Sequence, residues 1–199
     1  MCIRDRKKGL TFARGLRSIL RHDPDKIMVG EIRDGETATI AVQAALTGHL
    51  VFTTVHANNA FDVLGRFTHM GVDAYSLVAA LNGVVAQRLI RINCTECGED
   101  DHPSRQLIEH AGLGSTDGFR FRRGKGCAQC RGTGFKGRKA IAEVLLLDDV
   151  LREMISAREP VRQIKEAARK NGTRLLREAG LDLVRRGETS LAELDRVVA

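Results

Sequence analysis

The N-terminal half of the chain alternates between helical and strand-like patterns of hydrophobic positions. Apolar residues recur at helical spacing over 9–22, and a short apolar run predicts a strand over 26–32. An alanine-rich stretch predicts a helix over 36–48, and the continuous apolar and β-branched residues of 49–56 predict a strand covered on both faces. Strands and helices that alternate in this way are typical of a parallel sheet, so the predicted fold class is α/β.

Two more helices are predicted before the pattern changes, over 58–70 and 73–89. Between 94 and 137, glycine, cysteine and charged residues dominate, apart from a short helical stretch at 104–110. Strand-like composition returns at 138–149, so the cysteine-rich segment is predicted to be an insertion into the main fold.

The rest of the chain follows a helical period. Glycines separate the predicted helices, which cover 149–156, 160–171, 173–186 and 190–198. The pattern therefore predicts three parts, which are a core domain over 1–93, the insertion over 94–137, and a return strand with a C-terminal helical subdomain over 138–199.

Composition and charge narrow the class of protein. The chain has 199 residues, 43% of them hydrophobic, and a net charge of +7 from 32 Lys and Arg against 25 Asp and Glu. This charge would suit nucleic acid or an acidic membrane surface, but basic and acidic residues are interspersed, and one Tyr with no Trp leaves little to stack on bases. We therefore predict no nucleic-acid partner. No run approaches the ~18 apolar residues of a membrane span and no signal-peptide core is present, which predicts a soluble, cytoplasmic chain.

Four of the five cysteines form two C-x-x-C pairs, Cys94 with Cys97 and Cys127 with Cys130. This spacing lets two thiolates meet one ion, so two pairs predict a tetrahedral, structural zinc site. The pairs are 29 residues apart, so the intervening chain is predicted to fold back as a finger with the metal at its base. Redox catalysis by one pair and unligated core cysteines are the alternatives. Cys2 lies in the opening segment MCIRDRKK, which shows neither periodicity nor capping and is interpreted as a junction.

A carboxylate and a histidine follow the two predicted strands. Glu31 comes at the end of the first strand, in the stretch DPDKIMVGEIRD, where ligands bind in open α/β sheets. His56 ends the second strand and is predicted to lie beside Glu31 if the strands are neighbours. His49 begins that strand, and its spacing of seven residues from His56 places the two histidines on opposite faces, which argues against a joint metal site. The alternative for Glu31 is an exposed acid with no function. The alternative for His49 is a structural hydrogen bond.

Residues 19–60 closely resemble the Walker B and histidine-box region of the ATPases of type II secretion and type IV pilus assembly. The segments VAQRLIRINC (85–94), GCAQCRGTGFKGRKAIAEVL (126–145) and TRLLREAGLDLVRRGETSLAEL (173–194) continue the resemblance. The tetracysteine element is similar to that of the assembly ATPases, whereas the related retraction motors usually lack it.

The resemblance implies a partial RecA-like P-loop ATPase core within a homohexamer that hydrolyses ATP with Mg²⁺. It also implies a location in the cytoplasm, peripheral at the inner membrane, where the partners are the inner-membrane platform and other cytoplasmic-facing proteins of the secretion or pilus machine. By position, Glu31 resembles the carboxylate that orients water or magnesium, and His56 and His49 match the histidine box. The cofactor-binding positions it implies are Arg33, Asp34, Arg88 and Arg91, although charged residues there equally suit subunit contacts.

The family's phosphate loop, G-x-x-x-x-G-K-[ST], does not occur in this sequence. The nearest stretch, RGKGC at 123–127, lacks the earlier glycine and the hydroxyl residue, and it lies among the cysteines. We therefore expect the last part of a longer enzyme, which alone neither binds ATP tightly nor hydrolyses it. A zinc-containing module that binds nucleic acid or protein, and a non-catalytic homologue that docks partners, are the alternatives.

Overall fold

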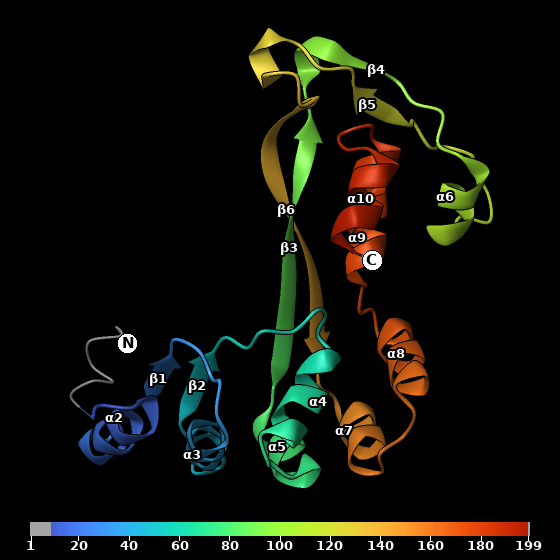
Figure 1. Ribbon diagram of the computed structural model, residues 1–199. Coiled ribbons are helices and arrows are strands. Elements are labelled where there is room, and N and C mark those ends of the chain that lie inside the picture. Colours follow the sequence, from blue (N-terminus) through green and yellow to red (C-terminus); the bar gives the residue numbers. More distant parts are fainter. Residues whose placement is uncertain (1–8, 199) are drawn as a thin grey trace. The chain divides into compact units, whose positions relative to one another are not determined.

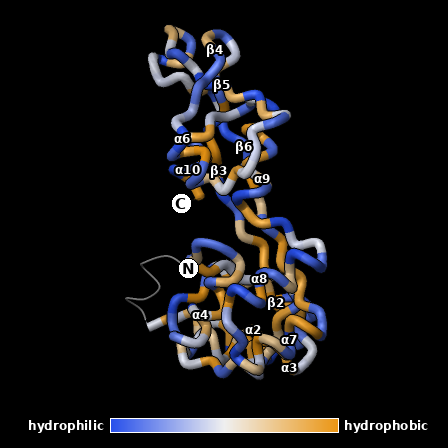
Figure 2. Tube along the Cα trace, turned by 90° about the vertical axis from the view of Figure 1, so that its right-hand side faces the viewer, coloured by the Kyte–Doolittle hydropathy of each residue, from blue (hydrophilic) through white to orange (hydrophobic). Residues whose placement is uncertain are grey.

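The computed structural model describes residues 9–198, which divide into two units (Figure 1). Each unit has a hydrophobic core. Unit 1 comprises the residues up to 84 together with 145–173, and unit 2 comprises 85–144 and the residues from 174. Hydrophobic residues occur within each unit (Figure 2). The predicted junction at residues 1–8, with Cys2, lies outside the described residues.

Unit 1 combines a short parallel sheet with helices. Strand β1 (Lys26–Val29) pairs in parallel with β2 (Leu50–Thr53), with Val29 opposite Thr53 at their carboxyl ends. The helices are α2 (Phe12–Ile19), which continues into a 3-10 turn, η1 (Leu20–His22), and then α3 (Gly35–Leu46), α4 (Asp62–His69), α5 (Ala74–Ala80), α7 (Asp149–Ser156) and α8 (Val161–Lys170).

The sequence explains how α3 meets the sheet. Its alanines Ala38, Ala41 and Ala44 are buried in the same core as Ile27 and Val29 of β1, because small side chains let helix and strand approach closely. The strands alternate as a period of two requires, with one set of residues facing this core.

The opposite face of the sheet contradicts a prediction. Met28, Leu50 and Phe52 are 75%, 41% and 54% exposed, so the prediction that the strand at 49–56 is covered on both faces is wrong for the residues described. Its continuous apolar composition is typical of a doubly covered parallel strand, but nothing in residues 9–198 packs on that side.

Unit 2 is built on two long paired strands, β3 (Gly83–Asn93) and β6 (Phe135–Leu146), most of whose residues belong to this unit. Between them lie η2 (Thr95–Cys97), β4 (Gly98–Asp100), α6 (Arg105–His110), β5 (Arg122–Gly124) and η3 (Ala128–Cys130), and the C-terminal helices are α9 (Leu176–Arg185) and α10 (Leu191–Val197). Strands β4 and β5 are antiparallel. The core joins β3, β6 and both C-terminal helices through Ile90, Ile141, Val184 and Leu194.

The predicted helix over 73–89 is wrong in its second half. Asp73 caps α5 as expected, with its carboxylate accepting from the Ser76 N–H at 2.8 Å, but α5 ends at Ala80 and β3 begins at Gly83. A Cβ on Gly83 would lie 3.1 Å from the Leu145 carbonyl oxygen, so glycine permits the close approach of β6. Exposure along β3 largely alternates with period two. Pairing with β6 overrides the helical propensity of Ala86 and Leu89.

The other predicted elements of the C-terminal half agree with the structure. Helices at 104–110 and 149–156 are confirmed by α6 and α7, and the last three predicted helices by α8, α9 and α10, with their ends shifted by a few residues. The return strand at 138–149 is confirmed as β6, which begins and ends three residues earlier. None of the helices within residues 9–198 has both the length and the hydrophobicity that a membrane-spanning helix requires.

Candidate functional site

The carboxyl ends of β1 and β2 bring Glu31 and His56 together. The two strands are parallel and in register, so both chains leave the sheet at the same edge. The His56 Nε2 atom lies 3.4 Å from the Glu31 Oε2 atom. The structure thus places a carboxylate and an imidazole side by side, as expected from the sequence, at the position where open parallel sheets bind ligands.

Arg33 completes this cluster from the same loop as Glu31. Its Nε atom donates to the Glu31 Oε2 atom at 2.6 Å. This hydrogen bond, with the charges of Arg33 and His56, holds the pKa of Glu31 below its usual value despite some desolvation, so the carboxylate is ionised at neutral pH. The His56 side chain is 80% exposed and that of Glu31 26%, which leaves both groups open to a ligand from solvent.

Asp34 begins helix α3. One carboxylate oxygen accepts from the Thr37 N–H at 2.8 Å and the other from the Thr37 hydroxyl at 3.0 Å. This is an N-cap, which satisfies an otherwise unpaired amide of the first turn. The predicted cofactor role of Asp34 stays a prediction, and the contacts observed are those of a helix cap.

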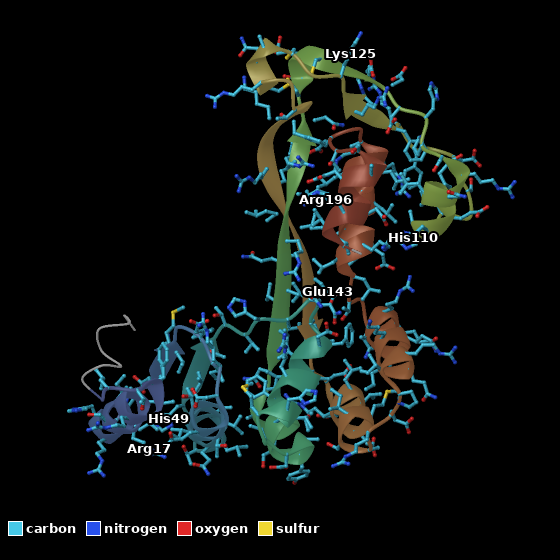
Figure 3. All side chains as sticks on the ribbon, in the orientation of Figure 1. Arg17, His49, His110, Lys125, Glu143 and Arg196 are labelled. Carbon is cyan, nitrogen blue, oxygen red and sulfur yellow. The ribbon has the colours of Figure 1, made fainter. Side chains whose placement is uncertain are left out.

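His49 lies at the other end of β2 (labelled in Figure 3), and the structure does not bring it to Glu31 and His56. Its Nδ1 atom is 3.0 Å from the Ala44 carbonyl oxygen and 3.3 Å from the Thr47 hydroxyl. Because a carbonyl can only accept, the Nδ1 atom carries the proton in this contact. The hydrogen bond ties the start of β2 to the end of α3, and a catalytic role for His49 stays a prediction.

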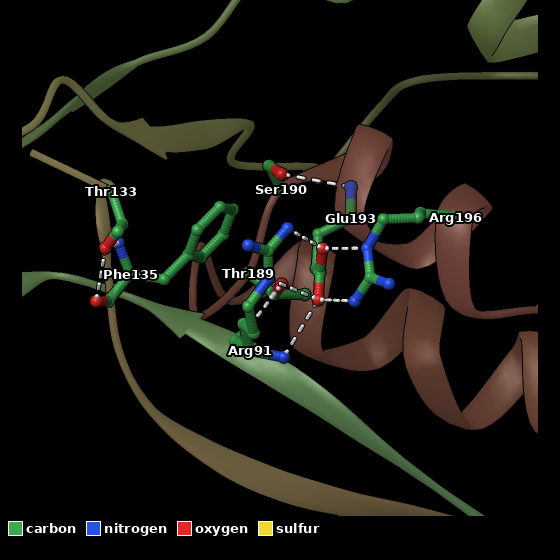
Figure 4. Close-up of polar contacts among 7 residues, drawn as sticks. All are labelled: Arg91, Thr133, Phe135, Thr189, Ser190, Glu193 and Arg196. Carbon is green, nitrogen blue, oxygen red and sulfur yellow. Dashed lines mark hydrogen bonds and ion pairs between the residues drawn. The ribbon is translucent and has the colours of Figure 1, made fainter.

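Arg91 lies in unit 2 and pairs with a carboxylate that the sequence did not single out. Its Nη2 and Nε atoms donate to the two oxygens of Glu193 at 2.6 and 3.0 Å, and Arg196 donates to both from the other side (Figure 4). The guanidinium also lies over the Phe135 ring, 4.2 Å from its centroid. Arg88, on the same strand, likewise belongs to unit 2, whereas Glu31 belongs to unit 1.

Glu193 is fully buried, yet it remains charged. Burial alone would raise the pKa of Glu193, but the hydrogen bonds from Arg196 and Arg91 outweigh it and lower the pKa to about 2. The Arg91 guanidinium of β3 is therefore held in an ion pair with Glu193 of helix α10. No local signal predicts this pair, since Glu193 is 102 residues further along the chain.

The four cysteines converge in unit 2 as predicted. Their sulfur atoms all lie within 4.8 Å of one another. The Sγ atoms of Cys94 and Cys127 are 3.9 Å apart, and Cys130 lies 3.8 Å from both Cys97 and Cys127. A regular tetrahedron with zinc–sulfur bonds of about 2.3 Å has sulfur–sulfur edges of about 3.8 Å, whereas a disulfide requires about 2.05 Å. The cluster can therefore hold a metal ion.

The turns around the cysteines supply amides to their sulfurs. The Cys127 and Gly134 N–H groups donate to the Cys130 Sγ at 3.1 and 3.2 Å, and the Gly126 N–H donates to the Cys97 Sγ at 3.3 Å. The hydrogen bonds from the Cys127 and Gly134 amides, with that of Cys127 the stronger, lower the pKa of Cys130 to about 6. Burial raises the pKa of Cys97 to about 12 despite the hydrogen bond from Gly126. Backbone amides that face sulfur are the surroundings that stabilise a thiolate ligand.

Comparison with known proteins relates nearly the whole chain to one family of secretion proteins. The family model for type II/IV secretion system proteins matches residues 2–196. The chain is 49% identical over 188 residues to the type IV pilus assembly ATPase PilB of Thermus thermophilus, and 46% identical over 191 residues to the type II secretion system ATPase E of Vibrio cholerae. These matches cover 94% of this chain but only 21% and 37% of those proteins.

Solved structures agree with the fold. The pilus retraction motor PilT with bound ADP superposes with a TM-score of 0.64 at 25% identity, over 94% of this chain and 43% of that one. The Legionella pneumophila ATPase DotB superposes with a TM-score of 0.63 at 22% identity, over 94% and 42% of the two chains. The predicted α/β fold class is confirmed.

Proposed function

Because the chain belongs to the type II/IV secretion system protein family, we propose that it is the C-terminal part of a hexameric ATPase that powers type II secretion or type IV pilus assembly. Two curated relatives carry these two activities in their names, and the chain spans about a fifth to two fifths of their length. Its partners would then be further copies of the same subunit and the inner-membrane platform of the machine, on the cytoplasmic side. Nucleic acid is not among them.

The observation that carries the proposal is the meeting of Glu31 and His56 at 3.4 Å. In phosphate-transfer ATPases an acid at the end of a buried strand polarises the attacking water or holds magnesium through water. Glu31 is ionised and partly open to solvent, which suits either task. His56 would donate to the terminal phosphate, while Arg33 holds the Glu31 carboxylate through the same Oε2 atom that His56 approaches.

The metal at the tetracysteine cluster is proposed to be structural zinc. Four thiolates at the corners of a tetrahedron leave no open coordination position, so no catalytic water can bind there. The ion would join the turn after β3 to the turn before β6 and so hold together the two ends of the segment between these strands.

A chimera tests the proposed activity. Residues 9–198 replace the matched region of the Thermus thermophilus relative, which supplies the phosphate loop that this sequence lacks. We expect magnesium-dependent ATP hydrolysis that falls by about a hundredfold or more in Glu31→Gln, because the carboxylate that orients water is lost. The matched control is Glu166→Gln, the same change at an exposed glutamate of α8.

The 199-residue chain by itself is expected to show no ATPase activity above background, since it holds no phosphate loop to cradle the nucleotide. Magnesium-dependent turnover by the purified chain that Glu31→Gln abolishes would contradict this expectation. Full turnover by the Glu31→Gln chimera would instead refute the role proposed for Glu31.

A further inference from the structure

The backbone around Glu31 belongs to neither a strand nor a helix. β1 ends at Val29 and α3 begins at Gly35, so Glu31 lies in a short irregular link between them. A catalytic carboxylate in such a link needs an external anchor, because a displacement of about 1 Å can cost two orders of magnitude in rate.

Thr54 supplies that anchor on both sides of Glu31. Its hydroxyl donates to the Gly30 carbonyl oxygen at 2.6 Å, and its own carbonyl oxygen accepts from the Ile32 N–H at 3.0 Å. The residues immediately before and after Glu31 are therefore both bound to one residue of the neighbouring chain segment. The Ile32 side chain, 3% exposed, fixes the same link from the core side.

The same residue also sets the position of His56. Thr54 is two residues before His56, in the segment that continues from the end of β2. His56 and Glu31 lie 3.4 Å apart on two chain segments. The two Thr54 hydrogen bonds hold these segments together. Thr53 cannot replace it, since Thr53 pairs with Val29 inside the sheet and its hydroxyl contacts the Thr54 carbonyl oxygen at 3.3 Å.

We propose that Thr54 is the positioning residue of the Glu31–His56 pair, with its hydroxyl holding the Glu31 backbone at the distance that the imidazole requires. The inference rests on the proposed function, which assigns those two residues to ATP hydrolysis. Both of these hydrogen bonds go to backbone groups, so Thr54 acts through the backbone of Gly30 and Ile32.

The first test measures the coupling between Glu31 and His56 in the 199-residue chain. The pKa of Glu31 is followed by NMR of its side-chain carboxyl carbon. Because the charge of His56 lowers this pKa, His56→Gln should raise it in the parent chain. In Thr54→Val, which keeps the β-branched shape and removes only the hydroxyl, that response to His56→Gln should disappear. A general loss of stability would not remove the coupling selectively, and Thr54→Ser should restore it.

The second test measures turnover in the chimera described above. We expect Thr54→Val to lower kcat about tenfold with KM for ATP within about twofold, because orientation of the water is affected more than nucleotide binding. Thr54→Ser should retain most of the activity. The matched control is Thr68→Val, which removes a hydroxyl that donates to the Leu64 carbonyl oxygen at 3.0 Å within α4.

The outcomes separate the two proposals. If Glu31→Gln abolishes turnover while Thr54→Val matches the parent in kcat and in coupling, the positioning role of Thr54 is refuted and the proposed function stands. If the parent chimera shows no magnesium-dependent turnover, the proposed function fails whatever Thr54 does. If Glu31→Gln leaves turnover unchanged, the role proposed for Glu31 fails. Equal loss in Thr54→Val and Thr68→Val would also refute the positioning role.

Discussion

At the scale of single residues, the surroundings of a glutamate decide whether it is available for chemistry or serves the structure. Glu31 and Glu193 are both glutamates with lowered pKa held by arginine, but Glu31 faces solvent at a strand end and Glu193 is sealed between β3 and α10. A partly exposed, ionised carboxylate beside an imidazole is available for chemistry. A buried carboxylate with two arginines is a structural joint, and its arginines stay half-exposed, so water can solvate them if the carboxylate is lost.

The Glu193 joint should make the stability of the chain depend on pH. The pKa of Glu193 falls from 4.5 to about 2 on folding, so its contribution is present above pH 4.5 and is lost as the pH falls toward 2. The shift corresponds to a stabilisation on the order of 3 kcal/mol. We expect Glu193→Gln to lower the free energy of unfolding at pH 7 and to flatten its decline between pH 4.5 and 2, measured by urea unfolding.

The matched control for this prediction is Glu166→Gln, at an exposed site on α8. It should leave both the stability at pH 7 and its decline in acid unchanged. A Glu193→Gln chain that loses stability over the same acid range as the parent would show that other carboxyls carry the effect.

At the scale of elements, local patterns were predictable and distant partners were not. Glu31 and His56 each follow an apolar strand, and because parallel strands end at one edge, their meeting could be expected from the sequence. Thr54 could not, since its role depends on which carbonyl its hydroxyl reaches across the sheet. Likewise the sequence pattern predicts residues 83–89 as the end of a helix, and their pairing with β6 makes them part of a strand.

The turns at the cysteine cluster offer a prediction at this scale. Gly134 has φ of 76°, and a Cβ on it would lie 2.3 Å from the Gly124 carbonyl oxygen, whereas Gly132 has nearly the same φ, 75°, and open space around it. Gly132→Ala should weaken zinc binding by about 1 kcal/mol, from backbone strain alone. Gly134→Ala should weaken zinc binding clearly more, because the backbone must move at the amide that donates to the Cys130 sulfur. Competition of a chelator for zinc measures both affinities.

The difference between the two glycine variants is the decisive quantity. The left-handed conformation is common to both positions, so it cancels in the comparison, and the contact with Gly124 remains. Equal zinc affinities for the two variants would mean that the close approach of these turns does not support the metal site.

At the scale of the whole molecule, the two units have different requirements. Unit 1 has a core of its own, which includes Leu16, Ile27 and Phe67, and among the residues described its polar site is closed by hydrogen bonds within the unit. Unit 2 has a core between its strands and α9 and α10, but the segment between β3 and β6 holds few buried apolar residues apart from Ala111 and two cysteines. A segment with so little apolar burial needs a further constraint, which a bound metal provides.

Removal of the metal should therefore affect the two units unequally. The purified chain is expected to contain about one zinc per chain, which four thiolates in tetrahedral geometry require. After treatment with a chelator under reducing conditions, amide hydrogen exchange should rise by at least about tenfold over 94–104 and 121–137, as local unfolding becomes frequent. Exchange in β1 and α3 of unit 1 should change little, because no cysteine of the cluster lies there. Cys130→Ser should reproduce the pattern without chelator, whereas unchanged exchange around the cysteines would mean that the hydrogen-bonded turns hold their shape without metal.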